Sequence, residues 1–162
     1  MDPFLIWLEG TSFSIWMREE PSIWAFPAIL AVHTIGMGLV AGISAALDLR
    51  ILGVGRGLPV QEMRRFYPVM WVAFWLNFAS GIALLIGYPT KALTNPVFYL
   101  KLVFIAVAVA LAVRIGHRIA GADDDRVRRL KGMATLSLLC WAGAIFAGRL
   151  LAYTHSRLMA IE

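Results

Sequence analysis

The chain has 162 residues, of which 60% are hydrophobic and 15% are charged. Soluble domains carry about 25% charged residues, so this composition, with a mean hydropathy of +0.74, excludes an ordinary soluble domain and indicates an integral membrane protein in a lipid bilayer. The net charge of +5 comes from basic loops, as membrane topology requires, and therefore does not indicate nucleic-acid binding. The single cysteine, Cys140, excludes an internal disulfide.

The N-terminal segment 3–20 is rich in aromatic residues and also carries three glutamates and one arginine. Its apolar residues recur at helical spacing, but Gly10 interrupts the pattern and the segment is too polar to cross a bilayer. We expect an amphipathic helix at the membrane interface, anchored by tryptophans. These are Trp7, Trp16 and Trp24.

Four apolar stretches follow, and each is close to the roughly 20 residues that a helix needs to span the hydrocarbon core. The first begins at Pro21 or at Pro27, because either proline suits the first turn of a helix. The sequence predicts an all-α membrane protein of one domain, 1–162: a four-transmembrane-helix antiparallel bundle with an N-terminal interfacial helix. The predicted spans are about 22–47, 66–88, 97–118 and 133–154.

The basic residues between the spans predict an orientation. Arginine and lysine are concentrated in the segments 48–65 and 119–132 and in the helix end before the second of them. The positive-inside rule places such loops in the cytoplasm. We therefore expect a multi-pass protein of the bacterial inner membrane with both termini outside.

Each predicted span contains polar side chains that are costly inside a membrane and are therefore candidates for function. With a rise of about 1.5 Å per residue, Lys101 and Arg149 lie about 7–8 Å from the outer ends of their spans, and His33 lies roughly 9–16 Å deep. Asn77 lies near the middle of the second span. No carboxylate is expected inside a span, so the two cations need an anionic partner from elsewhere.

Haem b fits this pattern, since its iron accepts a neutral imidazole and its propionates pair with lysine or arginine. His33 would then be the metal ligand, and Lys101 and Arg149 would hold the propionates. Asn77 would line the pocket, and Tyr153, four residues after Arg149, would form its outer rim. The second axial ligand is open, with His155 at a suitable depth and His117 at the opposite end of the bundle.

Simpler interpretations compete with this one. Lys101 and Arg149 can extend to the lipid headgroups, and His33 can form a hydrogen bond to a backbone carbonyl or to Asn77 inside the bundle.

Small residues predict where the spans approach one another closely. Gly38 and Gly42 form such a pair on the first span, and Gly143 and Ala147 form another on the fourth. Gly36, three residues after His33, could also leave room for a flat macrocycle beside its ligand.

Four segments resemble an uncharacterised family of bacterial four-span inner-membrane proteins, and the resemblance extends over about residues 24–153. They are HTIGMGLVAG (33–42), ALDLRILG (46–53), NPVFYLK (95–101) and AGRLLAY (147–153). A histidine in the first span with a lysine at the start of the third also resembles HemJ-type protoporphyrinogen oxidases and the membrane domain of copper resistance protein D. In the HemJ type both positions are essential and haem b is bound. This resemblance implies haem and redox chemistry, with His33 and Lys101 as the counterparts.

Three functions are consistent with the sequence. The first is a haem b-binding membrane protein in electron transfer or in porphyrin or quinone redox chemistry. The second is a non-catalytic accessory subunit of a larger membrane complex or a homo-oligomer, in which the cations pair with a partner's carboxylates or with lipid phosphates. The third is a small copper or proton transporter. The sequence lacks CxxC, HExxH and paired-histidine motifs, so no catalytic residue is assigned and enzymatic activity is left open.

Overall fold

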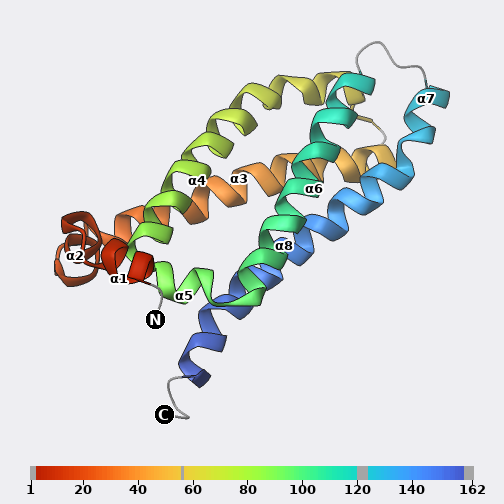
Figure 1. The fold of residues 1–162 in the computed structure, drawn as a ribbon. Helices are drawn as coiled ribbons and strands as arrows, with labels where there is room; N and C mark the ends of the chain where they lie inside the picture. Colours follow the sequence, from red (N-terminus) through yellow and green to blue (C-terminus); the bar gives the residue numbers. More distant parts are fainter. Residues whose placement is uncertain (1–2, 56, 120–123, 159–162) are drawn as a thin grey trace.

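The computed structural model describes residues 3–55, 57–119 and 124–158, except for the side chains at positions 124, 152 and 154–158. Within these residues there is no strand, and four helices are long and apolar enough to cross a membrane. This confirms the predicted all-α bundle. Figure 1 shows the four helices as an antiparallel set: α3 (Phe26–Leu52), α4 (Tyr67–Gly87), α6 (Pro96–Arg118) and α8 (Lys131–Leu158).

The four long helices are arranged as two pairs. Helix α3 packs along α4, α6 packs along α8, and α3 also contacts α8. Helices α4 and α6 meet near one end, where the Tyr67 hydroxyl donates a hydrogen bond to the Ala112 carbonyl at 3.1 Å. In Figure 1 the two pairs diverge from that end toward the end that carries the N-terminal helices.

Two names identify the ends of the bundle. The basic end carries the 3-10 helix η1 (Val60–Phe66) and the short helix α7 (Asp124–Arg129), which together contribute five arginines. The opposite end, here called the α1/α2 end, carries the two N-terminal helices and the short helix α5 (Pro89–Leu93) between α4 and α6. Between 17% and 33% of each apolar window is buried inside the protein, so most of the apolar surface faces outward, as expected for a multi-pass membrane protein.

The first long helix differs from its predicted range, 22–47. It begins at Phe26 with Pro27 in its first turn, which decides between the two candidate prolines. It ends at Gly53, whose left-handed backbone (φ 109°) lets its N–H donate to the carbonyls of Leu49 and Arg50, each at 3.1 Å. Because this helix ends later than predicted, Asp48 lies inside a candidate membrane span. The expectation that no span holds a carboxylate is therefore wrong.

The N-terminal segment, predicted as one interfacial helix over 3–20, forms two helices. These are α1 (Pro3–Glu9) and α2 (Ser12–Glu19), separated at Gly10 and Thr11. Thr11 makes the break favourable because its hydroxyl donates to the Leu8 carbonyl at 2.8 Å and accepts from the Ser14 N–H at 3.4 Å. The second helix therefore starts with its own N-cap.

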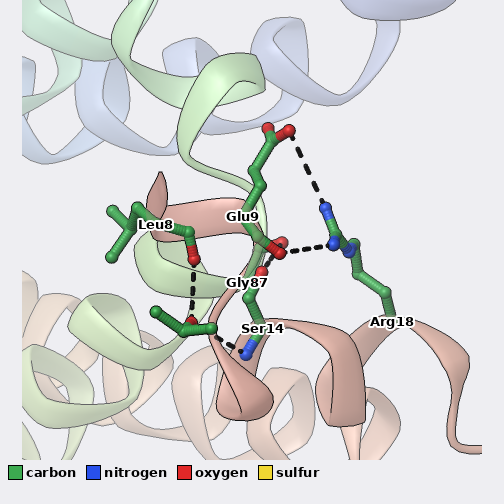
Figure 2. Close-up of polar contacts among 6 residues, drawn as sticks. Leu8, Glu9, Ser14, Arg18 and Gly87 are labelled. Atoms are coloured by element: carbon green, nitrogen blue, oxygen red, sulfur yellow. Dashed lines mark hydrogen bonds and ion pairs between the residues drawn. The ribbon is translucent and has the colours of Figure 1, made fainter. Parts of the chain in front are cut away.

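Polar contacts join the two short helices to each other and to the end of α4 (Figure 2). The Arg18 guanidinium donates to the Glu9 carbonyl at 2.7 Å and lies 3.9 Å from the Glu9 carboxylate. The buried Ser14 hydroxyl donates to the Gly87 carbonyl at 3.3 Å. Buried Met17 packs so tightly on Gly87 that a side chain there would collide with its sulfur. The segment thus covers the end of the α3–α4 pair.

Glycines set the closest helix contacts. A Cβ at Gly36 would lie 3.0 Å from the Asn77 Cβ and 3.1 Å from the Ala73 carbonyl oxygen, so Gly36 packs against α4 and does not itself leave space for a macrocycle. Gly143 lies against the Phe104 ring, as expected for a close contact on α8. By contrast, a Cβ at Gly38 or Gly42 would meet nothing within 4 Å.

Two alanine substitutions on α3 should therefore act in opposite directions. Gly36→Ala should lower the free energy of unfolding by about 1–3 kcal/mol, because the new methyl group overpacks against the backbone of α4. Gly38→Ala is the matched control and should leave that free energy unchanged or raise it by up to about 1 kcal/mol, since it removes a helix glycine in open space. Titration with SDS in detergent micelles, followed by circular dichroism, measures both. Equal effects of the two variants would contradict the α3–α4 contact described here.

Candidate functional site

His33 lies on α3, seven residues after the start of the helix and so about 10 Å from the α1/α2 end. Its ring is half-buried, and Nδ1 lies 3.0 Å from the Asn77 carbonyl oxygen and 3.2 Å from Ser80 Oγ. Since a carbonyl oxygen can only accept, the Nδ1–H donates to it and Nε2 is the nitrogen with the free lone pair. The buried Ser80 hydroxyl is itself held by the Leu76 carbonyl at 2.7 Å.

Helix α4 accommodates this ring because it has a glycine at the contact. A Cβ at Gly81 would lie 3.1 Å from His33 Cε1 and 3.5 Å from Nδ1. A larger residue at position 81 would therefore push the imidazole away from the Asn77 carbonyl. The orientation of His33 thus depends on three features of one turn of α4: the Asn77 carbonyl, the Ser80 hydroxyl and the absence of a side chain at Gly81.

Lys101 approaches the same region from the other helix pair. It lies on α6, five residues after Pro96, and its half-buried side chain passes Gly148 of α8, where a Cβ would lie 3.9 Å from Nζ. Lys101 is close enough to His33 for its charge to act on the ring. In the described part of the chain no carboxylate lies within ion-pair distance of Lys101. Lys101 is therefore a cation without an acidic partner among these residues, as the sequence predicted.

Asn77 contacts His33 through its backbone carbonyl and adds a polar side chain. Its Oδ1 atom is buried and has no hydrogen-bond partner among the described residues. An acceptor buried without a donor costs about 1–3 kcal/mol. The structure therefore brings together His33, Asn77 and Lys101 of the five predicted site residues.

The other two predicted residues lie elsewhere on α8. Arg149 is exposed, and Tyr153 is 66% exposed on the same side of the helix, one turn further along. His117 is exposed on the last turn of α6 at the basic end, far along that helix from Lys101. The side chain of His155 lies outside the described residues.

A row of aromatic rings on α4 was not anticipated from the sequence. Neighbouring rings lie edge to face or stacked, with centroids 5.4–6.3 Å apart. Two of them, Trp75 and Phe78, are more than half exposed. Their spacing of three and four residues would have placed them on one face of a helix, next to Asn77. The four rings are Trp71, Phe74, Trp75 and Phe78.

The sequence reasoning also missed Asp48, which is 1% exposed. It lies fifteen residues after His33 on the same helix, and so about 22 Å away along the axis. At that distance it cannot neutralise Lys101. The sequence feature that could have indicated Asp48 is its spacing of four residues from Ser44. Both residues are buried on the inner face of α3.

Neither a set of metal-ligating side chains nor a related protein identifies what the site binds. No group of three or more histidine, cysteine, aspartate or glutamate side chains that could hold a metal ion occurs in the described ranges. A metal at His33 would therefore need ligands from a macrocycle or another molecule. Comparison of the chain with protein-family models, with curated protein sequences and with solved structures finds no match.

The tautomer of His33 can be tested directly. In protein with 15N-labelled histidine, His33 should show a protonated Nδ1 and an unprotonated Nε2 at neutral pH, because the Asn77 carbonyl accepts only from Nδ1–H. His33→Gln assigns the signal, and the exposed His117 serves as the internal control, with the averaged signals of a solvated ring. A proton on Nε2 of His33 would contradict the hydrogen bond to Asn77.

Proposed function

We propose that the protein is a haem b-binding integral membrane protein that serves electron transfer or porphyrin or quinone redox chemistry. The observation that carries the proposal is the orientation of His33. Its Nδ1 is held by a backbone carbonyl and a hydroxyl, and no hydrogen bond of Nε2 occurs among the described residues. Histidines that ligate metals almost always donate their other ring N–H to a carbonyl or carboxylate in this way.

The neighbouring residues fit the same ligand. Lys101 supplies a cation without a described carboxylate partner, which a propionate would neutralise by a charge-assisted hydrogen bond. Asn77, whose backbone carbonyl accepts from His33, would line the pocket. A single histidine gives one axial ligand, and the rest of the coordination would come from the porphyrin and from a second ligand not yet assigned. When bound, haem b would supply a one-electron redox centre.

In this proposal each residue of the site has a defined role. The Asn77 carbonyl and Ser80 hold the His33 ring in one tautomer and orientation, and Lys101 balances the charge of a propionate. Arg149 and Tyr153, on the exposed side of α8, would form the outer rim. There Arg149 can reach either the second propionate or a lipid phosphate, since long basic side chains extend toward the interface.

The resemblance of His33 and Lys101 to the HemJ-type positions supports the same assignment. We further propose that the protein lies in a bacterial inner membrane. In that arrangement the basic end, with the segments 48–65 and 119–132, faces the cytoplasm and both termini lie outside, in agreement with the positive-inside rule.

Pigment measurements on purified variants test the proposal. The wild-type protein should show a Soret band and a dithionite-reduced difference spectrum of haem b, and His33→Ala should abolish both. His117→Ala, which removes an exposed histidine at the other end of α6, should leave both unchanged. A wild-type preparation that stays colourless after haem is added would exclude haem binding.

Lys101→Met should weaken haem binding roughly tenfold to hundredfold, because it removes a charge-assisted hydrogen bond of about 1.5–3 kcal/mol. Lys91→Met is the control, since Lys91 lies on α5 at the same end of the bundle. Titration of the purified variants with haem in detergent measures the affinity. Arg149→Met distinguishes its two roles: a loss similar to that of Lys101→Met assigns it to a propionate, and unchanged affinity assigns it to lipid.

One observation favours a second function, that of a non-catalytic subunit in a larger membrane complex or homo-oligomer. Gly38 and Gly42 are exposed and meet no other part of the described chain, although such pairs usually lie between helices. A colourless preparation that co-purifies with a large assembly, and loses it on Gly38→Leu, would support this second function over haem binding.

A further inference from the structure

A second polar cluster lies near the basic end of the bundle, on a different part of the inner surface from His33. Helix α3 contributes Ser44 and Asp48, α4 contributes Tyr67, and α8 contributes Ser137 and Trp141. Asp48 and Ser137 are 1% and 0% exposed, and Trp141 is 4% exposed. This cluster takes no part in the haem site proposed above.

The cluster contains polar atoms that the protein does not satisfy. The Ser137 hydroxyl is close enough to the Asp48 carboxyl to interact with it, but neither Asp48 Oδ2 nor Ser137 Oγ forms a hydrogen bond of normal geometry. Trp141 Nε1, one helical turn after Ser137, also lacks a partner. Two unsatisfied buried groups from two helices, the Asp48 carboxyl and the Ser137 hydroxyl, therefore lie close to each other, and a third, Trp141 Nε1, lies one turn along α8.

Two small cavities adjoin these atoms. The first is lined by Asp48, Ser44 and Tyr67 together with apolar side chains of α4 and α6. The second is lined by Ser44 and Trp141, again among apolar residues. Each offers about 10 Å³ in which the centre of a water molecule fits, and this is about the space that one buried water requires. The first cavity can thus place a water molecule beside the Asp48 carboxyl group.

The charged and titratable groups around Asp48 are few. Helix α4 contributes Tyr67, which lies within electrostatic reach of Asp48 and of Arg64 on η1, and whose hydroxyl donates to the Ala112 carbonyl. Helix α6 contributes only apolar contacts to this cavity, and the nearby residues of α8, Ser137 and Trp141, do not titrate. No arginine or lysine of the described chain lies within ion-pair distance of Asp48.

These surroundings decide which ion the carboxyl can bind. An ionised carboxylate buried without a cation is costly in a membrane, so Asp48 needs a positive partner. Calcium requires six to eight oxygen ligands, whereas the cluster offers one carboxylate, two serine hydroxyls and a phenol. A proton needs only the carboxyl and one or two hydrogen-bond partners, which Ser137 and a water molecule provide.

We propose that Asp48 is an intramembrane proton-binding site that exchanges protons with the basic end of the bundle through water in the first cavity, which Asp48 lines. A hydronium ion on that side gives its proton to Asp48, where an O–H bond forms on the carboxyl group and a neutral water is left. The resulting carboxylic acid donates to Ser137 Oγ or to water. The return of the proton to water restores the carboxylate.

Infrared difference spectroscopy of the full-length protein in lipid tests this site. On lowering the pH, every aspartate that becomes protonated gives a carbonyl band that shifts in D2O and shifts again when aspartate is labelled with 13C. The wild-type protein should develop one such band that belongs to Asp48. Asp48→Asn should lose this band completely. Glu62→Gln is the matched control, because Glu62 is an exposed carboxylate on η1 at the same end, and it should keep the band.

Ser137→Ala provides a second test that leaves the carboxyl group in place. It should keep a titrating band but move its frequency, because the acid loses its serine partner. Should Asp48→Asn fail to fold, the 13C shift in the wild-type protein and the Ser137→Ala displacement together still decide the assignment. The proposal is overturned if wild-type protein and Asp48→Asn show the same 13C-sensitive aspartic acid bands at every pH at which the protein stays folded, or if Ser137→Ala displaces none of them.

Discussion

A membrane-spanning protein must satisfy its buried polar groups internally, because the hydrocarbon core offers no water. Most polar atoms of this bundle obey that constraint, including Ser14, Tyr67 and Ser80, whose hydroxyls all donate to carbonyls. Among the residues that the structure describes, four buried side-chain atoms do not, and they form two groups. One is Asn77 Oδ1 beside His33, and the other surrounds Asp48. The constraint therefore identifies two polar sites, at different depths, without reference to any related protein.

The arrangement of the helix pairs explains why these two sites differ in access. Near the basic end α3 contacts α8, and Tyr67 connects α4 to α6, so Asp48 is enclosed and only water-sized cavities adjoin it. Toward the α1/α2 end the pairs diverge (Figure 1), and His33 and Lys101 are half-buried on opposite pairs. His33 and Lys101 thus approach the same region from different helix pairs, whereas Asp48 lies inside the packed end of the bundle.

Hydropathy and helical spacing predicted the number of spans, their approximate ends and the proximity of His33, Asn77 and Lys101. They could not predict how each helix is rotated about its axis, because packing sets that rotation. Arg149 therefore lies on the exposed side of α8 although its depth matches that of Lys101. Asp48 was missed for a related reason. The helix was expected to end at the first charged residues, but the left-handed Gly53 ends it one turn later and carries Asp48 into the bundle.

The two sites lie on one helix but are separated by apolar packing. Between them, buried Val40, Met70, Ala108 and Cys140 belong to a single apolar cluster, which fills the centre of the bundle around α3. The second cavity reaches Val40 but no residue of the His33 turn. A proton bound at Asp48 would act on the His33 region only through the field of its charge. Over about 22 Å of helix, two unit charges interact by about 0.8 kcal/mol at the effective dielectric constant of about 20 that describes protein sites, so Asp48 and His33 are only weakly coupled.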